Sequence, residues 1–377
     1  MVGGSLDAFI GEVHRKAAAL DSAFELVCGA FSSSPEKSKA TGEALGLNPN
    51  RVYGSYKEMI EAEAKLPENE RMQAVSIVTP NHVHFDPAKL SLENGFHVII
   101  DKPLAFSLDE AVQLKDIVDR TGLILALTHT YTGYPMIKEA KHFVDSGKLG
   151  DVRKIYVEYP QGWLSTPLEQ EGNKQASWRT DPAKSGEGGA VGDIGTHAAN
   201  LAEYVTGLTI TELSADVNIT VKDRLLDDDS AALLRFNNGA TGVLMATQIA
   251  AGEENDLKLR IYGEKAGLEW THSDPNTLMY KPLDGPSQRL RAGTGYLSEA
   301  ATLNTRTPAG HPEGYLEAFA NLYLAFHRAV TDHINGELKP LSEYDFPDVE
   351  DGVRGMTFVK AMIESGKSDK KWHKITG

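Results

Sequence analysis

The sequence predicts an α/β protein with two domains: a doubly wound parallel sheet, then an α+β domain with a large, open, mostly antiparallel sheet. A length of 377 residues exceeds the usual size of one domain. Helical and strand patterns alternate in the first part, which is typical of a parallel sheet with right-handed crossovers. Long alternating segments replace them after about residue 146. We therefore expect domains at residues 1–145 and 146–377.

The first domain is expected to contain five helices and four strands after its opening loop. Apolar residues at helical spacing predict helices at residues 9–20, 35–45, 56–65, 86–94 and 108–121. Short apolar runs predict buried strands at residues 24–31, 74–79, 95–100 and 123–128. A glycine-rich loop opens the chain, and only Met1 and Val2 precede it. Because a central strand normally leads into such a loop, we expect several apolar residues upstream of Met1.

The second domain shows the alternation of half-buried strands. Strands are expected at residues 152–159, 212–222, 229–236, 240–249 and 257–262. Asn237-Asn238-Gly239 is typical of a hairpin turn between two of them. Helices are expected at residues 195–205, 312–335 and 348–365. A polar stretch covers residues 161–187, and polar loops are expected at residues 271–310.

Composition excludes several classes of function. The chain has 38 Lys and Arg against 53 Asp and Glu, a net charge of −15, which argues against nucleic-acid partners and docking on anionic membranes. The single cysteine, Cys28, forbids an intrachain disulfide and fits a reducing compartment. No apolar run has the length of a membrane span, and residues 1–7 do not resemble a signal peptide. We expect a cytoplasmic protein.

The opening loop predicts a dinucleotide site. Gly3, Gly4 and Gly11 flank the start of a helix, where free amides and the helix dipole favour a pyrophosphate. The strict G-x-G-x-x-G spacing is absent, and Ser5 stands where a second glycine is expected, so a plain tight turn is the alternative. Residues 79–84 and 101–104 follow neighbouring strands and should lie at the same sheet edge.

The loop after the second expected strand bears on the choice of cofactor. An acidic residue there would bind the ribose 2′-hydroxyl. The chain has Ser32, Ser33 and Ser34 instead, with Lys37 nearby, and these groups suit a 2′-phosphate. An ordinary loop with helix caps is the alternative. Both NAD and NADP therefore remain candidates.

Three residues are candidates for acid/base chemistry. Asp193 and His197 are four apart, so a helix places them on one face, where the carboxylate can orient the imidazole as a general base. An isolated pair of this kind is also compatible with a helix cap and a structural histidine. Lys102 follows a buried strand and can stabilise an alkoxide. One cysteine and no H-E-x-x-H motif argue against zinc, and we expect no metal.

Taken together, these segments resemble the Gfo/Idh/MocA oxidoreductases, named for glucose–fructose oxidoreductase, inositol dehydrogenase and a rhizopine-catabolism protein. The resemblance covers nearly the whole chain, with motifs in order at Gly11-Glu12-Val13-His14, Val78-Thr79-Pro80-Asn81-His82-Val83-His84, Asp101-Lys102-Pro103, Trp178-Arg179 and Gly188 to His197. Further segments are similar to sugar- or inositol-type members: Tyr131 to Pro135, Tyr262 to Lys265, His311 to Tyr315 and Asp351 to Met356. Two departures are Ser5 in place of glycine and Asp101 in place of the usual glutamate.

The resemblance implies a Rossmann domain for NAD or NADP and a substrate domain that commonly forms an oligomer interface. It assigns catalysis to Lys102, Asp193 and His197. We assign the cofactor to Gly3, Gly4, Ser5, Phe9, Ile10, Ser32, Ser33, Lys37, Thr79, Pro80, Asn81, His84, Asp101, Lys102, Trp178 and Arg179. We assign the substrate to Lys102, Tyr131, Tyr134, Trp163, Asp193, His197, His311 and Tyr315, because aromatic faces and hydroxyl partners suit a polyhydroxylated ligand.

These observations predict an NAD(P)-dependent dehydrogenase that interconverts a secondary alcohol and a ketone on a sugar, sugar derivative or cyclitol. One alternative is a non-catalytic sensor of the same fold, such as the galactose-pathway repressor of yeasts. Retention of Lys102, Asp193 and His197 argues against it. A second is reduction of a dihydrodiol or an imine. The exposed sheet face predicts a homodimer or homotetramer.

Overall fold

The computed structural model describes residues 1–375, which fall into two compact units. The N-terminal unit comprises Met1–His129 and Phe319–Val353. The C-terminal unit comprises Thr130–Ala318 and the described residues from Arg354 onward. The chain thus passes between the units three times, and the expected boundary after residue 145 stays a prediction for independently folding domains.

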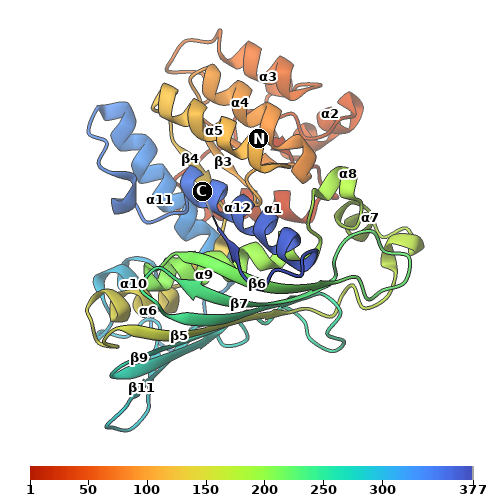
Figure 1. Ribbon diagram of the computed structural model, residues 1–377. Helices are drawn as coiled ribbons and strands as arrows, with labels where there is room; N and C mark the ends of the chain where they lie inside the picture. Colours follow the sequence, from red (N-terminus) through yellow and green to blue (C-terminus); the bar gives the residue numbers. More distant parts are fainter. Residues whose placement is uncertain (376–377) are drawn as a thin grey trace. The chain divides into compact units, whose positions relative to one another are not determined.

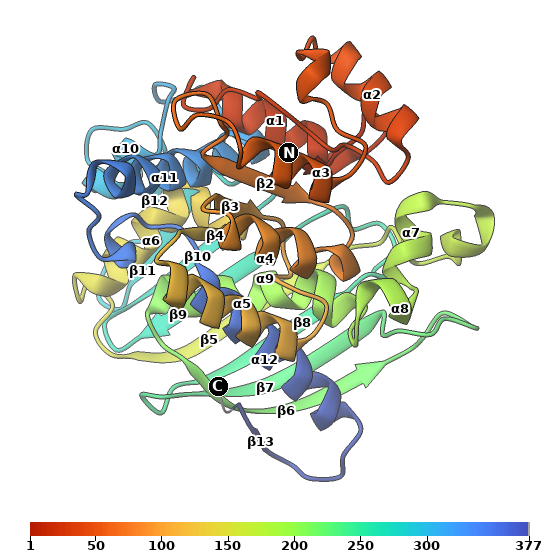
Figure 2. The same cartoon turned by 90° about the horizontal axis from the view of Figure 1, so that it is seen from above.

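The N-terminal unit contains a four-stranded parallel sheet in the order β1-β2-β3-β4. Its strands are β1 (Val2–Gly3), β2 (Ala74–Val78), β3 (His97–Ile100) and β4 (Leu125–Leu127). Its helices are α1 (Phe9–Leu20), α2 (Pro35–Ala44), α3 (Tyr56–Glu63), α4 (Phe85–Glu93) and α5 (Leu108–Thr121), with short 3₁₀ turns at Pro49–Arg51, Asn81–Val83 and Leu341–Glu343. Helices α3, α4 and α5 lie side by side (Figures 1 and 2). The predicted alternation of strands and helices is confirmed.

The prediction of a strand at residues 24–31 is wrong. Only isolated parallel bridges form there, between Ala30 and Val2 and between Gly29 and Val52. The neighbouring strand β1 has two residues, and the backbone bonds along this edge include Gly3 N donating to Ala30 O at 2.9 Å, Ala30 N donating to Met1 O at 3.0 Å and the Met1 amino group donating to Cys28 O at 2.9 Å. The apolar run is nevertheless buried at Phe31, which packs with Met1 and Val52.

The C-terminal unit contains a nine-stranded mixed sheet in the order β12-β11-β10-β9-β5-β8-β7-β6-β13. Its strands are β5 (Val152–Pro160), β6 (Ile210–Asn218), β7 (Asp229–Phe236), β8 (Thr241–Thr247), β9 (Lys258–Gly263), β10 (Ala266–Thr271), β11 (Thr277–Pro282), β12 (Gln288–Arg291) and β13 (His373–Lys374). Strands β5 and β8 pair in parallel, and the other neighbours are antiparallel. The predicted fold class is therefore confirmed, including the hairpin at Asn237 to Gly239, where Gly239 has a φ of +88°.

The helices of this unit are α6 (Pro135–Asp145), α7 (Lys174–Arg179), α8 (Pro182–Ser185), α9 (Thr196–Thr206) and α10 (Glu299–Leu303), with 3₁₀ turns at Thr130–Gly133 and Leu168–Glu171 and a π-helix at Val191–Gly195. Helices α11 (Tyr315–Asn335) and α12 (Val349–Gly366) contribute to both units. The expected loop at residues 271–310 is wrong in part, because β11, β12 and α10 form within it. Cross-strand pairing of β11 with β10 and β12 outweighs its polar composition.

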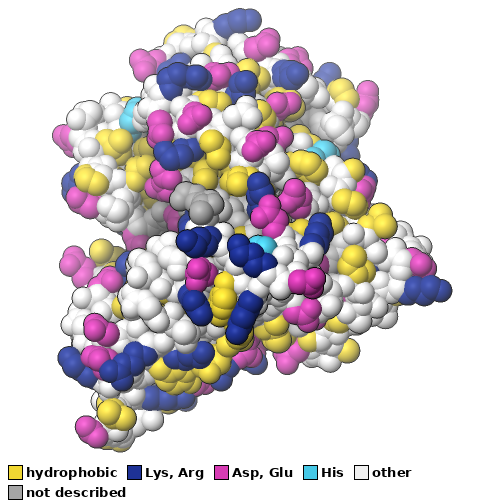
Figure 3. Space-filling model, viewed as in Figure 1, with side chains coloured by type: hydrophobic (Ala, Val, Ile, Leu, Met, Phe, Trp, Pro, Cys, Tyr) yellow, Lys and Arg dark blue, Asp and Glu magenta, His cyan; other side chains and the backbone are white. Residues whose placement is uncertain are grey.

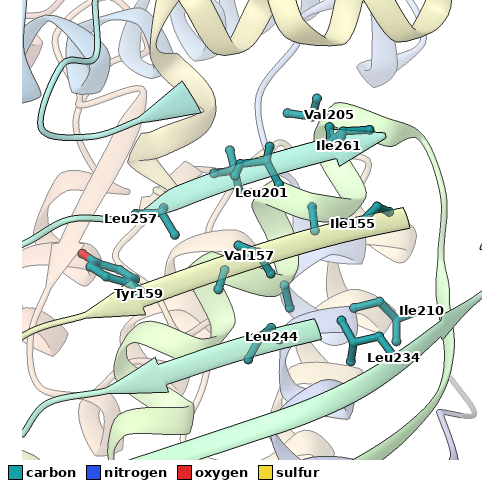
Figure 4. Close-up of a cluster of buried hydrophobic side chains, with 14 of the residues drawn as sticks. Ile155, Val157, Tyr159, Leu201, Val205, Ile210, Leu234, Leu244, Leu257 and Ile261 are labelled. Atoms are coloured by element: carbon teal, nitrogen blue, oxygen red, sulfur yellow. The ribbon is translucent and has the colours of Figure 1, made fainter. Parts of the chain in front are cut away.

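One face of the nine-stranded sheet carries the core. Side chains from β5, β8 and β9 point toward α9, with the labelled residues Ile155, Val157, Tyr159, Leu244, Leu257, Ile261, Leu201 and Val205 in one cluster (Figure 4). The other face is exposed: along β7, buried and exposed residues alternate strictly after Asp229. On the side of the molecule shown in Figure 3, Lys and Arg side chains are interspersed with Asp and Glu. Among residues 1–375, no helix is long and apolar enough to span a bilayer.

Candidate active site

The glycine loop lies tightly against the first turns of α1. Gly3 and Gly4 have φ values of +79° and +77°, which side-chain-bearing residues rarely adopt. A Cβ on Gly11 would lie 2.3 Å from the Cα of Gly4. No side chain caps the start of α1 at Ala8, so its first amides can bind an anion. The loop therefore fits a dinucleotide pyrophosphate despite Ser5, which donates a hydrogen bond to Asp7 Oδ1 at 2.6 Å.

The serine loop meets the glycine loop through an ion pair. Lys37 Nζ lies 2.7 Å from Asp7 Oδ2, and both side chains are about half exposed. Ser34 caps α2, and the Ser32 hydroxyl accepts from the amide of Ser34 at 3.2 Å. The structure thus brings the candidate ribose-binding residues beside the candidate pyrophosphate loop. Phe9 is exposed and Ile10 half-buried at the start of α1, and Ser33 is exposed.

The turns after β2 and β3 are joined by a buried imidazole. His84 Nδ1 lies 2.7 Å from the carbonyl oxygen of Pro103, and its Nε2 lies 2.8 Å from that of Thr79. Burial lowers the pKa of His84, and Asp101 and the two carbonyl oxygens oppose that shift. His84 is therefore a brace that fixes the turn containing Lys102.

The remaining candidates of this edge are held at the same two turns. Asp101 Oδ1 accepts from the Lys102 amide at 2.9 Å and from the Thr128 hydroxyl at 3.0 Å. Asn81 is buried in the 3₁₀ turn that Pro80 precedes. As expected, these residues lie in the turns at the carboxyl ends of β2 and β3. Their contacts with a cofactor stay predictions.

In the C-terminal unit, Asp193 and His197 lie on a continuous helical segment that begins with a π-helix. The amide of Thr196 donates to the carbonyl of Val191, the i to i+5 pattern of a π-helix, and α9 follows from Thr196. Asp193 lies in the π-helix and His197 in the first turn of α9. The expected helix at residues 195–205 is therefore correct but starts earlier, with different geometry.

A buried carboxylate holds the start of this segment. Asp227 Oδ1 accepts from the Gly189 amide at 2.6 Å, and Asp227 Oδ2 accepts from the Val191 amide at 2.7 Å. A Cβ on Gly189 would lie 2.1 Å from the Asp227 carbonyl oxygen. Burial raises the pKa of Asp227, and the two amides act against that shift. Asp227 thus fixes the backbone from which Asp193 projects.

An arginine stacked on tryptophan faces Asp193. Arg179 Nε lies 3.3 Å from Asp193 Oδ2. Its guanidinium carbon is 4.2 Å from the ring centre of Trp178 and 5.9 Å from that of Trp163. Gln175 Oε1 accepts from Arg179 Nη1 at 2.6 Å. Within this unit, Arg179 therefore lies at the carboxylate of Asp193 with Trp178 against its guanidinium, and the contact of both residues with a cofactor stays a prediction.

Three side chains form a closed ring of hydrogen bonds beside His197. The Tyr159 hydroxyl donates to Asn255 Oδ1 at 2.7 Å, and Asn255 Nδ2 donates to the Tyr131 hydroxyl at 3.0 Å. The hydroxyls of Tyr131 and Tyr159 bond to each other, so the Tyr131 proton is donated to Tyr159. Tyr131 also packs edge-on against His197, with ring centres 5.0 Å apart.

The internal ring restricts what the tyrosines can offer a ligand. Burial, opposed by the bonds to Tyr159 and Asn255, raises the pKa of Tyr131 to about 12, and Asp193 adds to the rise. The Tyr131 hydroxyl keeps its proton and directs it at Tyr159, so toward any further partner this hydroxyl can act only as an acceptor. Burial likewise raises the pKa of Tyr159.

Tyr134 is held in the same way through a histidine. His272 Nδ1 lies 2.6 Å from the carbonyl oxygen of Asn255, so Nδ1 carries the proton and Nε2 accepts. The Tyr134 hydroxyl donates to Nε2 at 2.9 Å. Through His272, Tyr134 thereby helps to hold the backbone of Asn255 in place beside Tyr131.

The other expected substrate residues are less uniform. Trp163 donates through Nε1 to Gln161 Oε1 at 3.0 Å. Tyr315 is half-buried and contributes to the electrostatic environment of Tyr159. His311 is exposed and its Nδ1 lies 3.3 Å from the Pro308 carbonyl oxygen, so nothing here connects it with the other candidates.

Sequence reasoning missed four polar residues of this site: Gln161, Gln248, Asn255 and Asp227. They lie in separate loops next to the ends of strands β5, β7, β8 and β9, in segments whose local pattern has no catalytic signal. Among the described residues, no three or more His, Cys, Asp or Glu side chains are arranged to hold a metal ion.

Comparison with known proteins matches both units. The family described as "Oxidoreductase family, NAD-binding Rossmann fold" (GFO_IDH_MocA) matches residues 1–129. The family described as "GFO/IDH/MocA C-terminal domain" matches residues 137–269. An uncharacterized oxidoreductase of Bacillus subtilis, YfiI, is 33% identical over 375 residues, which cover 99% of this chain and 95% of the relative.

Two solved structures share the fold over nearly the whole chain. An oxidoreductase from Sinorhizobium meliloti is 46% identical with a TM-score of 0.88, and the match covers 99% of this chain and 98% of that chain. An inositol dehydrogenase homolog from Azotobacter vinelandii, solved with NADH and myo-inositol, is 35% identical with a TM-score of 0.92 and coverage of 99% and 96%.

Proposed function

The chain belongs to the Gfo/Idh/MocA family of NAD(P)-dependent dehydrogenases, and we propose that it interconverts a secondary alcohol and a ketone on a sugar, sugar derivative or cyclitol. The observation that carries the proposal is the C-terminal cluster around Asp193 and His197. Its neighbours are neutral amides, tyrosines and one arginine, which suit a neutral polyhydroxylated ligand. The Azotobacter vinelandii homolog, solved with myo-inositol, supports the same substrate class.

We assign roles to three residues. His197 takes the proton of the reacting hydroxyl, and general-base catalysis of this kind contributes about 10²–10⁴-fold. Asp193 orients His197 and stabilises its charged form. Lys102 stabilises the developing alkoxide through its positive charge. The dinucleotide, when bound, supplies the nicotinamide that exchanges hydride with the carbinol carbon.

The proposal is tested by oxidation of a panel with NAD⁺ and NADP⁺, followed at the absorbance of the reduced nicotinamide. The panel contains myo-inositol, aldoses, an anhydrosugar, a trans-dihydrodiol and, in the reverse direction, a cyclic imine. We expect turnover with a sugar or cyclitol. Turnover with the dihydrodiol or imine alone would replace the proposal, and nucleotide binding without any turnover would favour the sensor alternative.

The catalytic assignment has a matched pair of variants. His197→Ala is expected to lower kcat by at least about 10²-fold while NADH still binds, because the base is lost and the nucleotide loop is untouched. His142→Ala, at an exposed position of α6, is the control and should keep full turnover. Near-normal turnover of His197→Ala would reject the assignment.

A further inference from the structure

A buried glutamine beyond the end of β8 binds the catalytic carboxylate directly. Gln248 is buried, with a relative exposure of 2%. Its Nε2 donates to Asp193 Oδ2 at 2.9 Å and to Gln161 Oε1 at 3.2 Å. Its backbone amide donates to the carbonyl of Asp228 at 2.9 Å, so the residue is held at both ends.

The orientation of this amide follows from its neighbours. The indole of Trp163 can only donate, so the Gln161 atom 3.0 Å from Trp163 Nε1 is an oxygen. The Gln248 atom facing that oxygen must then be the NH₂ group. The same NH₂ group faces Asp193 Oδ2, which accepts. Gln161 Oε1 therefore accepts from both Trp163 and Gln248, and the NH₂ group of Gln248 donates to Gln161 on one side and to Asp193 on the other.

We propose that Gln248 is a positioning residue for the reaction: its amide holds Oδ2 of Asp193 and so fixes the carboxylate that orients His197. This inference rests on the proposed function, in which Asp193 acts on His197. The second donor to the same oxygen, Arg179, is longer at 3.3 Å. Gln248 therefore supplies the shorter and more deeply buried of the two contacts.

The same hydrogen-bond network joins Asp193 to Tyr131 and Asn255, which lie beside His197. Gln161, which accepts from Gln248, also donates through its Nε2 to Asn255 Oδ1 at 2.6 Å. Asn255 belongs to the hydrogen-bonded ring with Tyr131 and Tyr159, and Tyr131 packs against His197. Loss of the Gln248 amide would therefore break the hydrogen bonds that connect Asp193 with Gln161 and, through Gln161, with Asn255 and the two tyrosines.

Three variants separate positioning from folding. Gln248→Met removes the donor and keeps the volume, and we expect kcat to fall about tenfold or more with little change in KM. Gln248→Glu keeps the shape but places an acceptor against Asp193 Oδ2. Gln288→Glu, on the exposed edge strand β12, adds the same charge away from the site and is the control.

The pH profile distinguishes the roles. Within the C-terminal unit, the charged and titratable groups near Asp193 include Arg179, Tyr131 and Tyr159, together with His197, four residues further along the same helical segment and packed against Tyr131. In Gln248→Glu, two carboxyl groups share one site, so a proton is retained between them and the protonated Glu donates as the glutamine did. We expect the kcat of Gln248→Glu, divided by that of the wild type, to rise as the pH falls. The ratio for Gln248→Met should stay constant.

A second readout does not depend on turnover. The carboxyl pair in Gln248→Glu raises the folded-state pKa above its unfolded value, so stability is lost as the pH rises through the folded pKa. We expect the Tm of Gln248→Glu, relative to the wild type, to fall between about pH 4.5 and pH 8. Gln288→Glu should show no such trend.

Each outcome decides a different point. Wild-type kinetics in Gln248→Met, or a pH-independent activity ratio in Gln248→Glu, would overturn the inference and leave the proposed function standing. If the wild type turns over no polyol, the proposed function fails, and the positioning role fails with it. A Tm difference without pH dependence would show that residue 248 does not face Asp193, which overturns the inference whatever the kinetics.

Discussion

Replacing Gly11 by alanine tests how closely the glycine loop must approach its helix. The added Cβ would lie 2.3 Å from the Cα of Gly4, whereas ordinary van der Waals contact begins near 3.4 Å. The loop and helix must therefore separate by about 1 Å at this point, the difference between the two distances. Such a shift moves the backbone amides that face the pyrophosphate.

Two opposing effects on stability can be separated with a control. Alanine favours a helix interior over glycine by about 1 kcal/mol. Gly355 lies in α12, and a Cβ added there would have no atom within 4 Å other than those of its chain neighbours and its own helix backbone, so Gly355→Ala should raise the free energy of unfolding by about that amount. Gly11→Ala gains the same preference but loses about 1–3 kcal/mol through overpacking. The difference between the two variants isolates the steric term.

The assays are urea unfolding for both variants and a fluorescence titration with NADH. We expect Gly355→Ala to be the more stable variant by about 1–3 kcal/mol and to bind NADH normally. Gly11→Ala should raise the Kd for NADH by about tenfold or more, since displaced amides lose charge-assisted hydrogen bonds. Equal stability and equal NADH affinity of the two variants would refute the close approach.

Three other expectations concern separate parts of the molecule. Asp227→Asn should lower the free energy of unfolding by about 1.5–3 kcal/mol in urea, because its NH₂ group would face the amide of Gly189 or Val191, and unchanged stability would contradict the clamp. Lys37→Met should weaken NADPH binding several-fold and leave NADH binding unchanged, because Lys37 lies beside the serine loop, and equal effects would remove it from cofactor selection. Light scattering should find a dimer or tetramer, since the outer sheet face is exposed, and a monomer at micromolar concentration would contradict this expectation.

Patterns within single segments were sufficient to predict most of the fold. The helical spacing at residues 108–121 has the same bounds as α5, where Ser107 caps the start and Gly122 ends the helix in the left-handed region. Strand 24–31 failed because its pairing depends on a partner strand of two residues, which local hydrophobicity cannot show. Strands β11 and β12 were missed because pairing partners, rather than composition, stabilise them.

The candidate site likewise contains residues that local patterns predict and residues that only the tertiary structure brings together. Asp193 and His197 were predicted because their spacing is a local property of one helix. Gln248 and Asn255 were missed because their importance arises only where separate strands and loops meet. A glutamine after a strand carries no signal by itself. The physical property that distinguishes it here is burial together with a charged acceptor, and both depend on the tertiary structure.

The π-helix shows how a distant residue changes even a local prediction. Spacing alone predicts an α-helix through Asp193 and His197, yet the turn at Val191–Gly195 widens to the i to i+5 pattern. Two glycines lie in this turn, so its intrinsic preference for the α-helix is weak. Asp227 meanwhile binds the amides of Gly189 and Val191, which sets the start of the turn from the loop that precedes β7. The direction in which Asp193 points is therefore determined jointly by Asp227 behind its backbone and by Gln248 at its carboxylate.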